Sequence, residues 1–436
     1  MRVNKKQITV MTVLNVIIAA LVATVLLYPA PVNASAPVTE PVDTEPTVHE
    51  KLRDAEEGKA EGILAETRLM GTGEERVVFS CEISGVLYIF GNATAAGLDF
   101  DGYGGFLCRL DETGKILGFT YFPGRMTAAC IAESGFLVGI TGEEDDKEVS
   151  RLYSVSPSGE SADVGRIDGY AEDIFSIGGT SVAVITRPYG AIKLTEYSYA
   201  GGAWSASRGT RISSGLDIDY FDCYYAGGGY VIAARAYDAP HYDSLVFYSF
   251  EAGGNASPHY FGGKENSMLT PYAVMPYDGG YLAVCRRGGV ATIATVDYTF
   301  TSYRRDSLEF SFDKASLFYA GGKYYACFDC PDGYVTYEID GSLNRRKLSA
   351  ADGCNVTCMV GSASAAFAAV TQDALTLRAL KSGETVAFNI KGCVVYKIIC
   401  SGGQATVVMS ASGGDAVGAP TGASDVYVLR IKFAGA

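Results

Sequence analysis

The sequence predicts an all-β fold: an eight-bladed β-propeller that follows an N-terminal transmembrane helix and a short linker. From about residue 63 onward, apolar β-rich runs are separated by glycine-containing turns, and one strand–turn–strand element recurs along this part of the chain. Successive copies of this element are separated by about 40–50 residues, the length of a four-stranded propeller blade. The composition agrees, because 29 Tyr and 20 Phe among 436 residues exclude disorder as the dominant state.

One small residue in each turn marks the recurring element, and adjacent markers lie 40 to 52 residues apart. Glycine suits this position because a tight hairpin needs a positive φ, which a Cβ penalises. The copy around Ala363 is degenerate, so a seven-bladed propeller is the alternative. The eight markers are Gly85, Gly135, Gly179, Gly228, Gly280, Gly322, Ala363 and Gly403.

Each copy is followed by a third strand with its own turn, such as Leu107 to Gly114, and then by a more polar fourth strand, such as Lys115 to Tyr121. This order is typical of a blade whose first strand lines the axis and whose fourth strand faces solvent. The last copy ends after its third strand, Asp425 to Phe433. We therefore expect Ile63 to Leu69 to supply the missing fourth strand and close the ring, which removes open sheet edges.

The Gly-Gly-Tyr-[Leu/Val] turns and the run from Phe106 to Leu117 resemble exported bacterial β-propeller repeats of the quinoprotein-like kind. The resemblance covers residues 63–433 as architecture and points to no specific family. Quinoprotein repeats usually place a Trp at the end of that run, whereas this chain has one Trp in all, Trp204. We expect no quinone and no other cofactor.

The N-terminal part predicts a membrane anchor. Ile8 to Tyr28 are 21 uncharged, mostly aliphatic residues, enough for a helix of roughly 30 Å that crosses a bilayer. Basic residues precede this segment and none follows until Lys51, so the rest of the chain is expected outside the cytoplasm. The predicted order is residues 1–7 in the cytoplasm, 8–28 in the membrane, 29–62 as a Pro- and acid-rich stalk, and 63–436 as the propeller. Cleavage after Ala36 is the alternative, and it would release a secreted protein.

Few residues predict catalysis or metal binding. The chain has three His, at 49, 241 and 259, and no Gly-x-Ser-x-Gly elbow on a strand-to-helix turn, so we expect no catalytic residue. Most of the 11 Cys fall in predicted strands, where Cys commonly acts as a small buried hydrophobe. Cys327 and Cys330 have C-x-x-C spacing without a helix to stabilise a thiolate. No metal site is expected, and the oxidation state of the cysteines stays open.

The charge distribution indicates which classes of binding partner the chain can have. A net charge of −14 and a pI near 4.8 argue against nucleic acid. Acidic clusters such as Glu143 to Asp146 are expected to be solvated turns. Basic runs at Arg286-Arg287, Arg304-Arg305 and Arg345-Arg346-Lys347 form a local exception, suited to an anionic glycan or phosphate polymer.

The connections between second and third strands share one face of a propeller, and aromatic and Arg residues gather there. Such residues suit recognition because they give large contact area at low entropic cost. We expect a monomeric binding or scaffold module for a cell-surface protein or glycan. The alternatives are a polysaccharide lyase or hydrolase that uses acids such as Asp101 or Asp219, and a spacer without ligand. The predicted binding residues are Asp99, Asp101, Tyr103, Arg187, Tyr189, Tyr237, His241, Tyr242, Arg286 and Arg287.

Overall fold

The computed structural model divides the chain into two units, Met1–Thr47 and Val48–Ala436. The predicted anchor and stalk lie outside the described residues. The described residues contain no helix that is long and apolar enough to cross a membrane. The structure describes residues 63–69, 75–94, 103–144, 147–188, 191–212, 218–226, 228–237, 244–261, 269–320, 322–331, 333–340, 342–352, 355–360, 365–370, 375–379, 385–390, 392–401, 404–412 and 425–432.

These residues form eight antiparallel four-stranded sheets, one for each repeat marker in the sequence. We number the sheets as blades and give the strands of each from the innermost outward. Blade 1 is β2 (Glu75–Ile83), β3 (Val86–Thr94), β4 (Tyr103–Leu110) and β5 (Ile116–Phe122); blade 2 is β6 (Arg125–Ala132), β7 (Gly135–Glu144), β8 (Lys147–Val155) and β9 (Ser161–Asp168); blade 3 is β10 (Tyr170–Gly178), β11 (Ser181–Arg187), β12 (Ile192–Ala200) and β13 (Ala203–Ile212); blade 4 is β14 (Ile218–Ala226), β15 (Gly229–Ala236), β16 (Ser244–Glu251) and β17 (Ser257–Phe261). Blade 5 is β18 (Thr270–Tyr277), β19 (Gly280–Arg287), β20 (Val290–Asp297) and β21 (Tyr303–Ser307); blade 6 is β22 (Lys314–Ala320), β23 (Lys323–Cys330), β24 (Gly333–Ile339) and β25 (Arg345–Asp352); blade 7 is β26 (Asn355–Val360), β27 (Ala365–Val370), β28 (Leu375–Ala379) and β29 (Thr385–Phe388); blade 8 is β30 (Val394–Ser401), β31 (Gln404–Ala411), β32 (Asp425–Lys432) and β1 (Ile63–Leu69).

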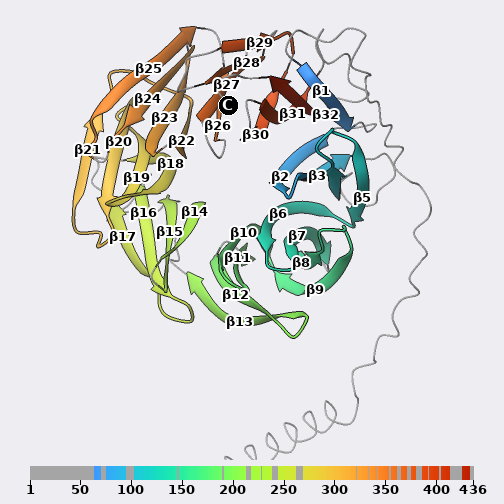
Figure 1. Ribbon diagram of the computed structural model, residues 1–436. Helices are drawn as coiled ribbons and strands as arrows, with labels where there is room; N and C mark the ends of the chain where they lie inside the picture. Colours follow the sequence, from blue (N-terminus) through green and yellow to red (C-terminus); the bar gives the residue numbers. More distant parts are fainter. Residues whose placement is uncertain are drawn as a thin grey trace, which may run out of the picture. The chain divides into compact units, whose positions relative to one another are not determined.

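The blades form a ring with the first strands innermost (Figure 1). Most neighbouring first strands contact one another, and β2 of blade 1 contacts β30 of blade 8. Between β10 and β14 the contact includes the hydrogen bond from Tyr220 to Asp173. The core lies between adjacent sheets: Phe90 of blade 1 meets Phe136 of blade 2 with ring centroids 4.9 Å apart, and Phe247 of blade 4 meets Tyr281 of blade 5 at 5.0 Å. Each sheet therefore buries both faces, which explains why second strands such as β19 are apolar along most of their length.

Glycine at the first turn of a blade is explained by two constraints, one seen at Gly85 and one at Gly280. Gly85 adopts φ +79°, a left-handed conformation that L side chains rarely take. At Gly280 an added Cβ would lie 1.9 Å from the carbonyl oxygen of Val296. At these two positions the residue that marks the repeat in the sequence is therefore the one that the hairpin geometry needs.

In blades 1 and 6 the turn between the third and fourth strands is held by an aspartate. Asp111 Oδ1 accepts hydrogen bonds from the backbone N–H groups of Thr113 and Lys115, at 2.8 and 2.9 Å. Asp340 Oδ1 does the same with Ser342 and Asn344, at 2.9 and 2.8 Å. Side-chain hydrogen bonds from Thr113 to Asp111 and from Asn344 to Asp340, together with these backbone hydrogen bonds, hold the pKa of both aspartates below the usual range.

The ring closes as the sequence predicts. β1 pairs antiparallel with β32, with Thr67 opposite Val428. Arg68 forms an ion pair with Asp425 at 2.5 Å, and the two side chains are 13% and 0% exposed. The Thr67 hydroxyl donates to the carbonyl oxygen of Gly114 at 2.5 Å, so the closing strand is also attached to blade 1.

Replacing Asp425 with Ala should lower the free energy of unfolding by roughly 3 kcal/mol, because it leaves the guanidinium of Arg68 buried without its carboxylate. Urea denaturation of the full-length protein measures the change. Asp163→Ala is the matched control, since Asp163 pairs with Arg151 at the surface and its loss should cost less than about 1 kcal/mol. Equal losses of unfolding free energy in the two variants would show that the buried ion pair contributes no more to stability than the surface pair.

Candidate binding face

The two ends of the blades differ in their connections. The links between second and third strands, and those from each fourth strand to the next blade, lie at one end, which we call the front face. The turns between first and second strands, and between third and fourth strands, lie at the other end, the back face. This follows from the antiparallel order within every sheet and from the ring of first strands.

The structure describes four of the ten predicted binding side chains, and it places all four at the front of blades 3 to 5. Arg187 ends β11, Tyr237 follows β15, and Arg286 and Arg287 end β19. Tyr103 begins β4, with only its backbone described. The other five predicted residues lie outside the described residues: Asp99, Asp101, Tyr189, His241 and Tyr242.

Arg187 and Tyr237 hold the front of blades 3 and 4. Arg187 Nε contacts Glu172 Oε1 at 2.6 Å, and another guanidinium nitrogen donates to the carbonyl oxygen of Ile218 in the next blade at 3.0 Å. The Tyr237 hydroxyl donates to the carboxylate of Asp219. Arg187 thus stabilises the boundary between blades 3 and 4, whereas Tyr237 joins the first two strands of blade 4.

Arg286 has a similar structural role between blades 5 and 6. Its guanidinium lies 4.8 Å from the ring centroid of Tyr272 and 5.3 Å from that of Phe312, and it donates a hydrogen bond to the carbonyl oxygen of Phe312. Stacking of this kind fixes an arginine against aromatic rings. Arg287, the next residue, is only partly exposed.

Two carboxyl groups, on Asp173 and Asp222, occupy equivalent positions in the first strands of blades 3 and 4. Each directly follows a β-bulge, and each lies six residues before the marker glycine of its repeat. The Tyr220 hydroxyl donates to Asp173 Oδ2 at 2.7 Å. Burial raises the pKa of Asp173, while burial and the nearby charge of Asp173 raise the pKa of Asp222 to about 6. The shared offset from the marker glycine is the one sequence signal that could have predicted this pair.

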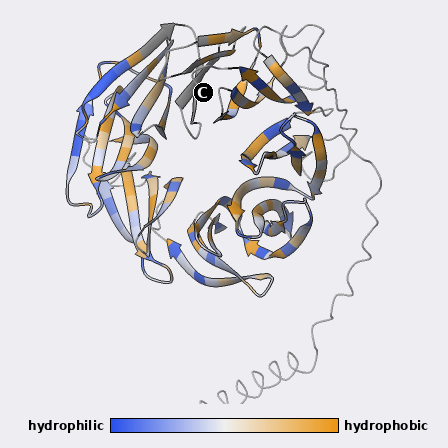
Figure 2. Cartoon of the chain, viewed as in Figure 1, coloured by the Kyte–Doolittle hydropathy of each residue, from blue (hydrophilic) through white to orange (hydrophobic). Residues whose placement is uncertain are grey.

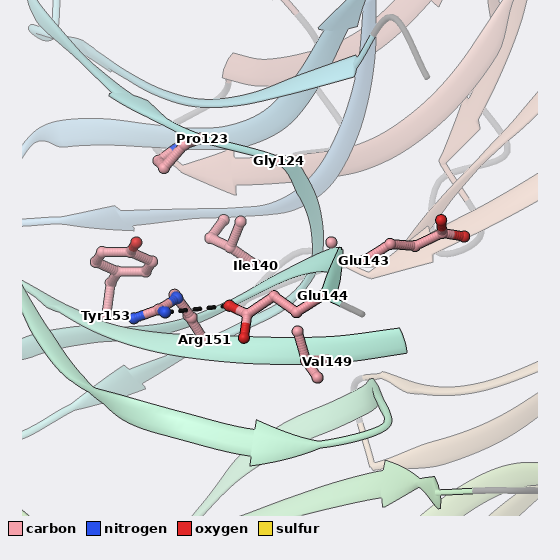
Figure 3. Close-up of a pocket in the computed structure, with 9 residues that line it drawn as sticks. Pro123, Gly124, Ile140, Glu143, Glu144, Val149, Arg151 and Tyr153 are labelled. Atoms are coloured by element: carbon pink, nitrogen blue, oxygen red, sulfur yellow. Dashed lines mark hydrogen bonds and ion pairs between the residues drawn. The ribbon is translucent and has the colours of Figure 1, made fainter. Parts of the chain in front are cut away.

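A hollow of about 260 Å³ opens at the front face between blades 1 and 2 (Figure 3). The ends of β7 and β8 form one side, and the link from blade 1 forms the other. Apolar walls and a charged group combine in a space that suits a small ligand or one residue of a longer chain. The lining residues are Pro123, Gly124, Ile140, Gly142, Glu143, Glu144, Val149, Arg151 and Tyr153.

Ion pairs fix the charged wall of the hollow. Arg151 contacts Glu144 Oε1 and Asp163 Oδ2, each at 3.1 Å, and Arg166 contacts Glu144 Oε2 at 2.8 Å. The ring of Tyr153 packs edge-on against Phe122 with centroids 5.6 Å apart. The side chains of Arg151 and Tyr153 are thus already ordered before any ligand arrives, which lowers the entropic cost of binding.

Glu143 differs from the other charged groups of the hollow. Its side chain extends away from Arg151 (Figure 3), and within the described part of the chain it has no hydrogen bond or ion pair. In the β7–β8 hairpin it lies directly opposite Glu148. The sequence predicts a solvated turn for this acidic run. The hollow could not be predicted from the run alone, because Pro123 and Gly124 from the link after blade 1 also line it.

Metal and thiol chemistry find little support in the described residues. No group of three or more His, Cys, Asp or Glu is placed to hold a metal ion in those segments. Cys327 and Cys330 are both free thiols. The ring of His259 stacks on Phe300 at 4.3 Å and bonds Ser249 at 2.9 Å, so its contacts are structural.

Comparison with known proteins identifies the fold. No family model and no curated protein matches the sequence. Among solved structures, the Dos1 propeller has a TM-score of 0.51 at 11% identity, with 82% of this chain and 93% of that chain covered. A putative 6-phosphogluconolactonase from Bacteroides uniformis has a TM-score of 0.46 at 12% identity, over 70% and 95%. A protein from Lactobacillus plantarum has 0.44 at 11%, over 69% and 94%. Likeness to the Dos1 propeller supports a β-propeller, and it concerns the fold alone.

The raised pKa of Asp222 predicts a pH-dependent stability. Because the folded-state pKa of about 6 exceeds the ordinary value of 3.8, the wild type should lose up to about 3 kcal/mol of stability, relative to Asp222→Asn, as the pH rises from 4 to 7. Urea denaturation across that range measures the difference. Asp297 is the contrasting control, because turn hydrogen bonds lower its pKa and its contribution is lost as the pH falls. A pH-independent difference between wild type and Asp222→Asn would contradict the assignment.

Proposed function

We propose that the protein is a membrane-anchored, extracytoplasmic binding module that captures a cell-surface protein or glycan with the front face of its propeller. The observation that carries the proposal is the ordered hollow between blades 1 and 2, which combines an aromatic wall with paired charges. Support for the location comes from the uncharged segment 8–28 and the basic residues before it. A propeller held beyond the membrane by a stalk would present this face to neighbouring molecules.

The chemistry of the hollow favours recognition over reaction. Arg151 is engaged by two carboxylates, so it offers its remaining donors to a ligand without being free to move. Pro123, Ile140 and Val149 give the hollow apolar surface beside these donors. A ligand with one apolar side and several hydroxyl or carbonyl groups fits this combination, as a sugar residue or a peptide turn would.

A second candidate function is polysaccharide cleavage, as a lyase or hydrolase. Asp173 and Asp222 favour it, because a carboxyl group with a raised pKa can donate a proton near neutral pH and a paired acid can accept one. Their side chains are largely buried, which is why we place this candidate second.

Replacing Arg151 with Met should weaken ligand binding about tenfold, because the variant keeps the apolar stem and loses the guanidinium donors. A glycan array and a pull-down of cell-surface proteins with the full-length protein identify the ligand, and titration measures the affinity. Arg211→Met is the control, since Arg211 is exposed on β13 of blade 3. Absence of saturable binding, or an equal loss with Arg211→Met, would refute the front-face site.

Polysaccharide cleavage is tested by the release of new reducing ends from acidic and neutral polysaccharides. If the second candidate is right, Asp222→Asn should reduce the rate at least a hundredfold, because it removes the proton-carrying group, while the protein stays folded. If Asp222→Asn releases reducing ends at the wild-type rate, the activity depends on other residues. If the wild type releases none, this candidate function is eliminated.

A further inference from the structure

One arrangement of side chains occurs twice at the back face, opposite the hollow, and its first copy is in blade 4. Tyr225 is 40% exposed and lies opposite the buried Tyr230 in the first hairpin, with ring centroids 4.9 Å apart. The Tyr230 hydroxyl donates to Glu196 Oε1 of blade 3 at 2.6 Å. One buried tyrosine therefore links an exposed ring to a carboxylate of the preceding blade.

Blade 6 repeats the arrangement at the equivalent hairpin position. Tyr319 is 48% exposed, and its ring lies 4.8 Å from that of Tyr324, its partner in the hairpin. The Tyr324 hydroxyl donates to Asp278 Oδ1 of blade 5 at 2.9 Å. Tyr225 and Tyr319 each occupy the penultimate position of their first strand. Isolated exposed aromatics are common, but two at one position of the repeat, with the same kinds of partner, are not scattered.

Blade 5, between these two blades, presents apolar side chains at the same end. Pro276 is exposed at the penultimate position of β18 and lies opposite Tyr281. Tyr298, in the other back-face turn of this blade, is 51% exposed. Its ring packs edge-on against Tyr281 with centroids 5.6 Å apart, and its hydroxyl donates to the carbonyl oxygen of Tyr277 at 2.8 Å. We call the four exposed side chains the back-face row: Tyr225, Pro276, Tyr298 and Tyr319.

The charged residues of the turns around this row are mainly acidic. The back-face turns of blades 4 to 6 comprise residues 226–229, 251–257, 277–280, 297–303, 320–323 and 339–345, with four acids and two bases. Each base is paired with an acid outside the turns: Lys323 with Glu338, at 2.7 Å, and Arg345 with Asp306. The four acids are Glu251, Asp278, Asp297 and Asp340. The exposed rings therefore lie in locally negative surroundings.

The described basic residues of blades 4 to 6 lie outside the inner hairpins, apart from Lys323. Lys323 directly precedes Tyr324 in β23, so its side chain points to the other face of the sheet, where it meets Glu338. Figure 2 shows the outer strands β21 and β25, which carry most of the others, as hydrophilic. The others are Arg235, Arg286, Arg287 and Lys314 at the front face, and Arg304, Arg305, Arg345, Arg346 and Lys347 on β21 and β25.

We propose that the back-face row, with the carboxylates of Glu196 and Asp278, binds a basic extended segment of a partner protein. A Lys or Arg side chain can pack its stem along a tyrosine ring while its cation lies over the ring, and a carboxylate nearby adds charge attraction. An extended segment that passes from blade 4 to blade 6 can place cations at both copies of the arrangement. The site is independent of the front-face hollow and adds a second binding surface to the molecule.

Charge and apolar surface favour a basic protein segment over other ligands. The net charge of −14 repels nucleic acid and acidic glycans, whereas it attracts a basic partner. A small cation would occupy only one copy of the arrangement, and an amino polysaccharide has no apolar side chains to pack on Pro276 and Tyr298. A protein segment brings cations and apolar side chains together, and apolar contacts surrounded by charged groups are typical of protein–protein interfaces.

The test uses full-length protein and a short synthetic peptide in which Arg and Lys alternate with Leu. The comparators are the same peptide with Glu in place of every basic residue, and a chitosan oligosaccharide of the same charge as the basic peptide. Titration at physiological ionic strength should show saturable binding of the basic peptide and much weaker binding of the other two. The double variant Tyr225→Ala, Tyr319→Ala should lose about tenfold in affinity, whereas the double Phe variant keeps the rings and the binding. Asp278→Asn should weaken binding and reduce its dependence on salt.

Two variants outside the back-face row are the matched controls. Tyr121→Ala removes a ring that is 49% exposed on β5 of blade 1. Glu133→Gln changes the net charge as Asp278→Asn does, in the first hairpin turn of blade 2, where Glu133 is exposed. Both should bind the basic peptide as the wild type does, and so should Arg151→Met, which alters only the front-face hollow.

Four results would overturn the proposal: no saturable binding of the basic peptide, equal binding of the Glu peptide, an equal loss in a control variant, or an equal loss in the double Phe variant. Equal binding of the chitosan oligosaccharide would also overturn it, because the row would then recognise an amino polysaccharide as well as it does a protein segment.

Discussion

Each sheet of this protein can bury both of its apolar faces only if another sheet covers each of them, and that requirement governs the rest of the structure. A row of such sheets leaves two faces bare at its ends, so the stable solution is a closed ring. The contact of β2 with β30 and the pairing of β1 with β32 complete it. Because the sheet faces are buried between blades, only the two ends of the blades and the outer strands are accessible to a ligand.

The repeat architecture was predictable because hairpin geometry restricts which residues can occupy the turns. Gly85 has a positive φ, and Gly280 lies too close to a carbonyl oxygen for a larger residue. Glycines at such turns therefore make the repeat visible in the sequence. The strand from Ile63 to Leu69 was also predictable, since the last repeat ended one strand short. Even the degenerate copy around Ala363 forms a sheet, because pairing of β26 with β27 depends on backbone hydrogen bonds more than on particular side chains.

The candidate sites were harder to predict because they depend on contacts between repeats. Arg187 and Tyr237 are predicted ligand-binding residues, and their hydrogen bonds to Glu172, Ile218 and Asp219 of their own or the adjoining blade could not be predicted from the sequence. The hollow beside Arg151 needs Pro123 from the preceding blade. The basic runs at 304–305 and 345–347 were visible in the sequence, but the ion pair between Arg345 and Asp306 is what joins them into one surface.

The closing pair also sets an order of events during biosynthesis. Arg68 and Asp425 are separated by 357 positions, so the contact that completes the ring joins the first and the last of the described strands. Contacts this distant in sequence form slowly, because the whole intervening loop must be ordered first. During synthesis the propeller therefore stays unclosed, with β1 unpaired and blade 8 incomplete, until β32 has been made.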